Sequence, residues 1–169
     1  GEVNFDDLVH GHRSFRHSEI GDFVVRRADG SAAFFFSNAI DDSLTGVTHV
    51  LRGEDLLSST PRQIVLWRAM VELGIADAMP TYAHMPMVMG EGTKKLSKRD
   101  PESNLFHHRD RGFLPEGPLN YLALLGWSIA PDRDVFTREE LVEAFDIADV
   151  NPNPARFDLK KAEAINAEH

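Results

Sequence analysis

The stretch VTHVLRGEDLLSSTPRQIVLWRAMVELG, residues 47–74, is the strongest indication of the fold class in this 169-residue chain. Its first five residues predict a buried strand, and the polar loop Arg52-Gly-Glu-Asp55 follows that strand. The run Ser59-Thr-Pro61 is typical of a helix start, with a hydroxyl cap and a proline near the first helical position. The helix ends at Gly74, and a second strand at about residues 82–89 completes a strand–helix–strand unit, which predicts a parallel sheet.

The segments on either side of this unit differ in character. Upstream, Asp22–Arg27 predicts a strand closed by a turn at residues 28–30, and residues 34–46 favour a short helix although their aromatic side chains also suit a strand. Downstream the pattern is helical throughout, over residues 103–111, 115–125, 137–145 and 155–169. Thr137 and Glu140 have the spacing of a capping box. The expected fold class is therefore α/β followed by α.

The composition narrows the class of protein. The chain has no cysteine, which excludes disulfides and thiolate zinc sites, and no apolar run of membrane-spanning length. A cytoplasmic protein fits these facts. The net charge of −9 argues against a nucleic-acid binder as a whole, but residues 94–111 carry six basic side chains against three acidic ones. Such a local excess can still bind phosphates, because salt screens distant charges beyond about 8–10 Å.

Two segments carry candidate chemistry. The basic run Lys94-Lys-Leu-Ser-Lys-Arg99 follows Gly90 and Gly92, as expected of a loop that closes over a polyphosphate, with Lys95 and Lys98 stabilising negative charge as pyrophosphate leaves. A solvated lysine-rich turn is the alternative. Arg52 falls just past a predicted strand, at the edge where open α/β sheets bind ligands, and its guanidinium suits a carboxylate or phosphate that Asn38 could orient. Alternatively, Arg52 pairs with Glu54 or Asp55, and Asn38 caps a helix.

The remaining histidines and tryptophans suggest packing rather than catalysis. His10 and His12 could chelate a metal, but the sequence shows no acidic or cysteine partner at helical or hairpin spacing, so we expect no protein-bound metal. His84 is expected to pack within its strand, and Trp67 and Trp127 are expected in the core.

Three runs resemble the bacterial glutamyl-tRNA synthetases, which are class I synthetases: residues 46–63, Lys95-Leu-Ser-Lys-Arg99 and residues 112–127. The second run looks like the KMSKS loop of that family, and the run NPARFDLKK over residues 153–161 is similar as well. The resemblance covers nearly the whole chain and is weakest over residues 1–20.

Membership of this family would imply a two-step reaction. Glutamate attacks the α-phosphate of ATP, which brings Mg²⁺ as part of the substrate, and the acyl group of glutamyl-adenylate then moves to the terminal adenosine of tRNA. The resemblance implies that Lys95 and Lys98 are catalytic and that they bind ATP together with Asp55, Val88 and Ser97. It implies that Phe34, Asn38 and Arg52 bind glutamate. It also implies that the acceptor arm of tRNA is bound by Arg99, Arg109 and Arg111. The family usually has tyrosine where this chain has Phe34.

The resemblance also implies a domain plan. Residues 1–33 would be the tail of an inserted acceptor-binding domain, residues 34–94 the second half of a Rossmann-type catalytic domain with a parallel sheet, and residues 95–169 the KMSKS-type loop with a helical stem-contact domain. The HIGH motif and an anticodon-binding region are absent from this sequence. We therefore expect a central fragment that cannot charge tRNA without the missing remainder of the polypeptide.

Three alternatives remain open at this point. One is a glutaminyl-type or tRNA-independent glutamyl-transfer relative. Another is a tRNA-binding module without catalysis, which would bind tRNA with a steep salt dependence and ignore ATP and glutamate. The third is a structural fragment with no function of its own.

Overall fold

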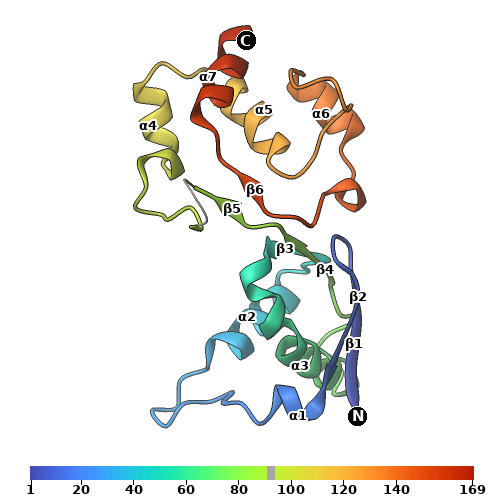
Figure 1. The fold of residues 1–169 in the computed structure, drawn as a ribbon. Helices are drawn as coiled ribbons and strands as arrows, with labels where there is room; N and C mark the ends of the chain where they lie inside the picture. The colour runs from blue at the N-terminus through green and yellow to red at the C-terminus, as the bar shows by residue number, and fades with distance from the viewer. Residues whose placement is uncertain (91–93) are drawn as a thin grey trace. The chain divides into compact units, whose positions relative to one another are not determined.

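The computed structural model describes residues 1–90 and 94–169, which form two compact units, Gly1–His84 and Met85–His169 (Figure 1). Gly92, one of the two glycines expected before the basic loop, lies outside the described residues. The domain limits expected at residues 33/34 and 94/95 stay predictions. No helix in the described part of the chain is long and apolar enough to cross a membrane.

The first unit combines one sheet with helices. Its elements are β1 (Glu2–Asp7), β2 (Gly11–Arg16), α1 (His17–Ile20), α2 (Phe34–Leu44), β3 (His49–Gly53), the 3-10 helix η1 (Glu54–Ser59), α3 (Thr60–Glu72) and β4 (Thr81–Met85). The strand order is β2-β1-β4-β3. β1 and β4 run parallel with Asp7 opposite Tyr82, whereas β1 and β2 form an antiparallel hairpin from Glu2↔Arg16 to Asp7↔Gly11. The sheet is therefore mixed, and the hairpin adds to the parallel strands that the sequence predicted.

Helix α3 contributes to both hydrophobic clusters of this unit. It packs on β1 on one side and on α2 on the other, so it is buried on two faces (Figure 1). Ile64 joins the cluster against the sheet, with Val3, Phe5 and Tyr82, and Trp67 joins the cluster against α2, with Ala39 and Met70. The prediction that Trp67 lies in the core is confirmed.

α2 and α3 end close to the glycines that the sequence predicted. Gly46 and Gly74 follow the two helices with φ of 70° and 69°, which is the left-handed conformation that glycine adopts at little cost. The start of α3 differs in detail. Ser59 occupies the cap position, but its hydroxyl donates to the Leu56 carbonyl, because η1 runs directly into α3.

Three strand predictions in this unit are wrong. Asp22–Arg27 forms no strand: it makes a single bridge, Arg26↔Ala32, since no neighbouring strand is available to it, although the turn at residues 28–30 is present. β3 begins at His49 rather than residue 47 and is half-exposed rather than buried, because it lies at the sheet edge. The strand expected over residues 82–89 is split at Pro86, which has no N–H to donate.

The second unit is mainly helical. Its elements are β5 (Val88–Met89), the 3-10 helix η2 (Pro101–Ser103), α4 (Leu105–Asp110), α5 (Glu116–Leu124), α6 (Arg138–Ala144), the 3-10 helix η3 (Ile147–Asp149), β6 (Ala155–Arg156) and α7 (Leu159–Glu168). α5 packs on α7 around Tyr121, Leu125, Ala162 and Ile165. Trp127 is buried and packs edge-on against Phe136, as a core residue should. The prediction of α/β followed by α is confirmed.

The last helix starts later than predicted. Ala155 and Arg156 form β6, parallel to β5, because the Ala155 N–H donates to the Met87 carbonyl at 3.0 Å. Asp158 then caps α7 by accepting from the N–H groups of Lys160 and Lys161. Helix α6 starts as predicted, with the Thr137–Glu140 capping box formed in both directions.

Candidate functional site

Arg52 lies near the carboxyl end of β3, within the strand rather than just past it. Its Nε donates to His84 Nε2 at 3.1 Å, and its Nη2 donates to Thr60 Oγ1 at 2.7 Å. Its guanidinium carbon lies 5.4 Å from the centre of the Tyr82 ring. β3, β4 and the start of α3 thus position one guanidinium between them.

Behind Arg52, His84 connects the guanidinium to Asp7 on β1. The Asp7 and His84 side chains are fully buried, and Asp7 Oδ2 lies 2.5 Å from His84 Nδ1. Asp7 Oδ1 accepts from the backbone N–H groups of Val9, His10 and His84 at 3.0, 2.9 and 3.2 Å. We call Asp7, His84, Thr60 and Arg52 the Arg52 network.

The electrostatics of this network follow from burial and hydrogen bonding. Burial alone raises the pKa of Asp7, but the hydrogen bonds from His84 and from the backbone outweigh it and lower the pKa to about 2. Burial lowers the pKa of Arg52 and raises the pKa of Tyr82 to about 12. Burial also raises the pKa of Asp42 on α2, while the charge of Arg52 opposes that rise. Asp7 is therefore a carboxylate at neutral pH, and Tyr82 keeps its proton.

Asn38 and Phe34 lie on α2. Asn38 Oδ1 accepts from Gln63 Nε2 at 2.5 Å, and Gln63 is itself buried in α3. The alternative that Asn38 caps a helix is wrong, because it lies inside α2. Phe34 is 57% exposed at the first position of α2 and packs edge-on against Phe35.

Sequence reasoning missed most of the Arg52 network. Asp7 and His84 are 77 residues apart, and no motif connects them. The sequence correctly predicted that His84 packs within its strand, but it predicted no partner for this side chain. The sequence analysis interpreted Thr60 only as part of a helix start, whereas in the structure its hydroxyl contacts Arg52, His84 and the Leu56 carbonyl. Only the sheet order, which puts β1 beside β4, reveals the connection.

The basic loop belongs to the second unit. It lies alongside β5: Gly90 N–H donates to the Lys94 carbonyl, and Leu96 N–H donates to the Val88 carbonyl, both at 2.9 Å. Ser97 and Asp100 then close a tight turn, in which Ser97 N–H donates to Asp100 Oδ2 at 2.7 Å. Lys95, Lys98 and Arg99 are exposed. The turn therefore presents cationic side chains to solvent from a hydrogen-bonded backbone.

Two of the three arginines expected to meet tRNA already have partners within the protein. Arg109 pairs with its neighbour Asp110 at 3.0 Å and lies over the Phe106 ring, and Arg111 pairs with Glu163 on α7. These pairs are at least one-third exposed, so each contributes little to the stability of the fold.

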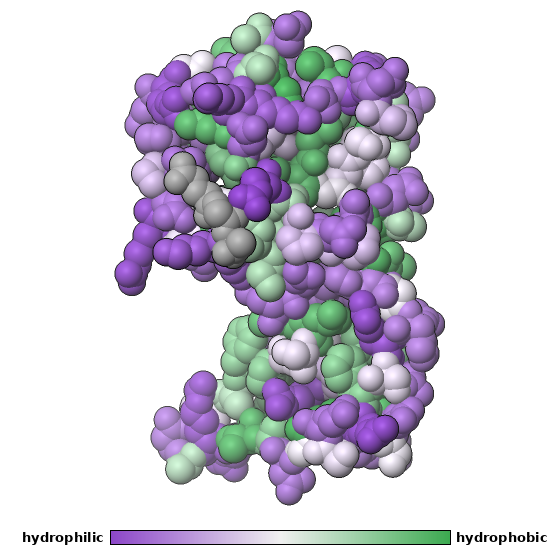
Figure 2. Space-filling model, viewed as in Figure 1, coloured by the Kyte–Doolittle hydropathy of each residue, from purple (hydrophilic) through white to green (hydrophobic). Residues whose placement is uncertain are grey.

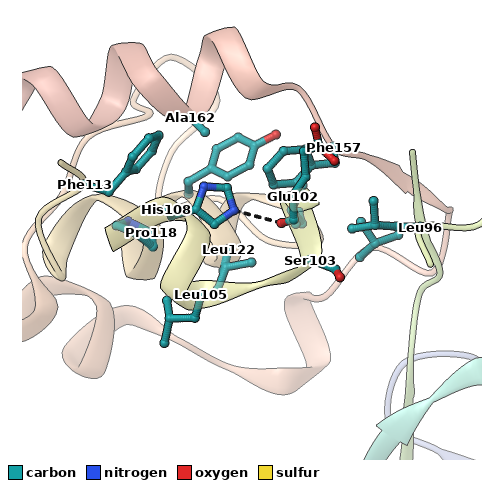
Figure 3. A pocket seen from close by; sticks show the side chains of 13 residues that line it. Leu96, Glu102, Ser103, Leu105, His108, Phe113, Pro118, Leu122, Phe157 and Ala162 are labelled. Carbon is teal, nitrogen blue, oxygen red and sulfur yellow. Dashed lines mark hydrogen bonds between the residues drawn. The ribbon is translucent and has the colours of Figure 1, made fainter. Parts of the chain in front are cut away.

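A cavity of about 220 Å³ lies beside the basic loop within the second unit (Figure 3). Its walls are mostly apolar and come from α4, α5, α7 and β5, with Leu96 of the basic loop at one side. His108 lines it and lies 2.8 Å, through Nε2, from the Glu102 carbonyl. The side chain of Leu96 thus borders the same cavity as the helices.

The visible face of each unit mixes hydrophilic and hydrophobic residues (Figure 2). The most exposed large apolar side chains are Val24, Leu44, Leu73, Leu105, Phe106 and Val142. Within residues 1–90 and 94–169, no group of histidines and carboxylates could hold a metal ion. The prediction that His10 and His12 lack an acidic partner at hairpin spacing is wrong, since His12 and Asp6 are cross-strand neighbours and their side chains lie 2.8 Å apart.

Comparison with known proteins identifies the family. The family model "tRNA synthetases class I (E and Q), catalytic domain" matches residues 1–164. Glutamate–tRNA ligases from Clavibacter sepedonicus and Leifsonia xyli subsp. xyli are 65% and 63% identical over 168 residues, which is 99% of this chain and 33% and 34% of those proteins. The chain spans about a third of the length of the curated relatives it matches.

A solved structure agrees with the sequence matches. The crystal structure of a glutamate tRNA ligase from Elizabethkingia meningosepticum, in complex with its amino acid, superposes with a TM-score of 0.86 at 31% identity. The superposition covers 99% of this chain and 36% of that chain. The resemblance inferred from the motifs is thereby confirmed, and the chain belongs to the class I tRNA synthetases for glutamate and glutamine, within their catalytic domain.

Proposed function

We propose that this chain is the central part of a glutamate–tRNA ligase. The observation that carries the proposal is its identity of 60–65% with glutamate–tRNA ligases over nearly its whole length. The Arg52 network supports the proposal independently, because hydrogen bonds to His84 and Thr60 hold the Arg52 guanidinium in place. Guanidinium groups bind carboxylates through two parallel N–H groups. A cytoplasmic location, where ATP and tRNA are used, is part of this proposal.

The reaction has two steps. An oxygen of the glutamate α-carboxylate attacks the α-phosphorus of Mg²⁺-bound ATP, an O–P bond forms, and the bond to the leaving pyrophosphate breaks. A ribose hydroxyl of the terminal adenosine of tRNA then attacks the acyl carbon, and AMP leaves. Both steps build or release phosphate charge, which fixed cationic groups stabilise.

Each candidate residue has a place in this proposal. Arg52 holds the side-chain carboxylate of glutamate, and Phe34 and Asn38 line the same pocket. Lys98, assisted by Lys95, neutralises the phosphates, and Asp55, Ser97 and the backbone near Val88 lie against ATP. Arg99, Arg109 and Arg111 meet the acceptor arm of tRNA; of these, Arg99 is exposed without a salt bridge among the described residues.

Glutamate-dependent ATP–pyrophosphate exchange by the full-length protein, with tRNA present, tests the proposal. We expect Arg52→Lys to raise KM for glutamate by about tenfold or more, because lysine keeps the charge but not the fork, while KM for ATP changes little. We expect Lys98→Ala to lower kcat by about 100-fold with a small effect on KM for glutamate. A wild-type protein without glutamate-dependent exchange would refute the function.

The isolated 169-residue chain is expected to be inactive in the same assay, since it contains no HIGH motif. Exchange by the purified chain above background would contradict this part of the proposal. Binding of tRNA to the chain with no response to ATP and glutamate in the full-length protein would instead favour the tRNA-binding module.

A further inference from the structure

We infer that Asp7 and His84 are positioning residues that determine which edge of the Arg52 guanidinium meets the ligand, and that they do so through the tautomer of His84. This inference rests on the proposed role of Arg52 in binding glutamate. Neither residue touches the ligand in this account; both act through Arg52.

The guanidinium group has two forks of parallel N–H groups, one formed by Nε and Nη2 and the other by Nη1 and Nη2. The first fork is occupied within the protein, because Nε donates to His84 Nε2 and Nη2 donates to Thr60 Oγ1. His84 Nε2 and Thr60 Oγ1 also lie within hydrogen-bond distance of each other, at 2.9 Å, so the Thr60 hydroxyl can donate to Nε2 while its oxygen accepts from Nη2. A carboxylate ligand must therefore bind the second fork.

The same contacts determine where His84 carries its proton. Arginine can only donate, so His84 Nε2 must accept, and the ring proton resides on Nδ1. Asp7 Oδ2 lies 2.5 Å from Nδ1 and accepts that proton's hydrogen bond. The Asp7 carboxylate thus keeps Nε2 free to accept from Arg52, in the way that a buried carboxylate commonly orients an imidazole.

The surroundings of Asp7 make the tautomer of His84 depend on the atom at the position of Asp7 Oδ2. Three backbone N–H groups, from Val9, His10 and His84, converge on Asp7 Oδ1, so no N–H donor can replace that oxygen. In Asp7→Asn the amide nitrogen must then take the place of Oδ2 and donate to His84 Nδ1. The ring proton moves to Nε2, which lies 3.1 Å from Arg52 Nε and 2.9 Å from Thr60 Oγ1. Nε2 then no longer accepts from Arg52, and the first fork loses one of its two acceptors.

Asp7→Asn in the full-length protein tests the inference in two measurements. Glutamate-dependent ATP–pyrophosphate exchange should show KM for glutamate raised by about tenfold or more, with KM for ATP within about twofold of wild type. Long-range ¹H–¹⁵N spectra of ¹⁵N-histidine-labelled protein should show the His84 proton on Nδ1 in the wild type and on Nε2 in the variant. Asp6→Asn is the matched control, since Asp6 directly precedes Asp7 in β1 and its side chain is 85% exposed.

A second pair of variants covers the case in which Asp7→Asn does not fold. Thr60→Val removes the hydroxyl that accepts from Nη2 at nearly constant shape and should raise KM for glutamate by about tenfold. Thr60→Ser, which keeps the hydroxyl, should recover most of the lost affinity.

The results separate this inference from the proposed function. An unchanged His84 tautomer in Asp7→Asn, or an unchanged KM for glutamate in both Asp7→Asn and Thr60→Val, overturns the inference while the ligase activity stands. A wild-type protein without glutamate-dependent exchange overturns the proposed function, and the tautomer measurement then still decides whether Asp7 controls His84.

Discussion

Asp7 Oδ2 lies 2.5 Å from His84 Nδ1, and neither side chain is exposed to solvent. The two residues lie 77 positions apart in the chain and are brought together by the pairing of β1 with β4. A carboxylate in such a place is stable only because hydrogen-bond donors surround it. Its ionisation therefore couples to the stability of the first unit.

The stability of the first unit should depend on the charge of Asp7. Because the folded pKa of about 2 lies below the usual 3.8, ionised Asp7 stabilises the fold above about pH 4, and this contribution disappears as the pH falls towards 2. The shift corresponds to about 2 kcal/mol in the free energy of unfolding. Urea unfolding of wild type and Asp7→Asn between pH 2 and 7 should show a difference that shrinks below pH 4.

Tryptophan fluorescence can report that difference for one unit. The chain has two tryptophans, Trp67 in the first unit and Trp127 in the second. In a Trp127→Phe background, Trp67 follows the first unit alone. A stability difference independent of pH across this range would contradict the assignment of the low pKa to Asp7.

Truncation of Ile64 should destabilise the first unit strongly. Ile64 is fully buried between α3 and the sheet, against Val3, Phe5 and Tyr82. Ile64→Ala should cost about 2–5 kcal/mol in the free energy of unfolding, and Ile64→Val about 1 kcal/mol. Leu73→Ala near the end of the same helix, where the side chain is 73% exposed, should cost less than about 0.5 kcal/mol. Equal effects of the two alanine variants would be inconsistent with this packing.

Gly117 should tolerate no side chain. A Cβ at this position of α5 would lie 2.9 Å from the Asn166 Cα on α7, which is too close for any contact and involves backbone that cannot rotate away. It would also displace the Asn166 side chain, whose Oδ1 accepts from the Leu114 N–H at 2.8 Å. Gly117→Ala should cost about 1–3 kcal/mol, measured by thermal unfolding of the second unit. Ala164→Ser, on an exposed position of α7, is the control and should stay within about 0.5 kcal/mol.

Substitution of Thr137, the cap residue of α6, should show how much the capping box contributes to stability. Thr137 Oγ1 accepts from the Glu140 N–H, and Glu140 accepts from the Thr137 N–H and from Arg133. Thr137→Ala should cost about 1 kcal/mol and speed amide hydrogen exchange in the first turn of α6. Thr137→Ser retains the hydroxyl and should leave the exchange rates near those of wild type. Loss of protection throughout the unit in Thr137→Ala, rather than at α6, would argue against a local cap.

Local patterns in the sequence were enough to predict several of the helices and the family. α3, α5 and α6 were predictable because local signals specify them: a proline near the helix start, apolar periodicity, a terminal glycine and a capping box act between residues close in the chain. The motifs around Arg52 and the basic loop likewise lie in continuous runs, and so they identified the family that the comparisons confirm.

The strands and the environment of Arg52, by contrast, depend on contacts between residues far apart in the chain. A strand needs a partner, so Asp22–Arg27 stayed irregular despite its composition, while Ala155-Arg156 became β6 because the Met87 carbonyl was available. Asp7 and Thr60 have no local signature of their role, since it exists only where β1, β4 and the start of α3 meet. Hydrogen bonds between distant residues depend on the topology of the sheet, and a one-dimensional pattern does not contain that topology.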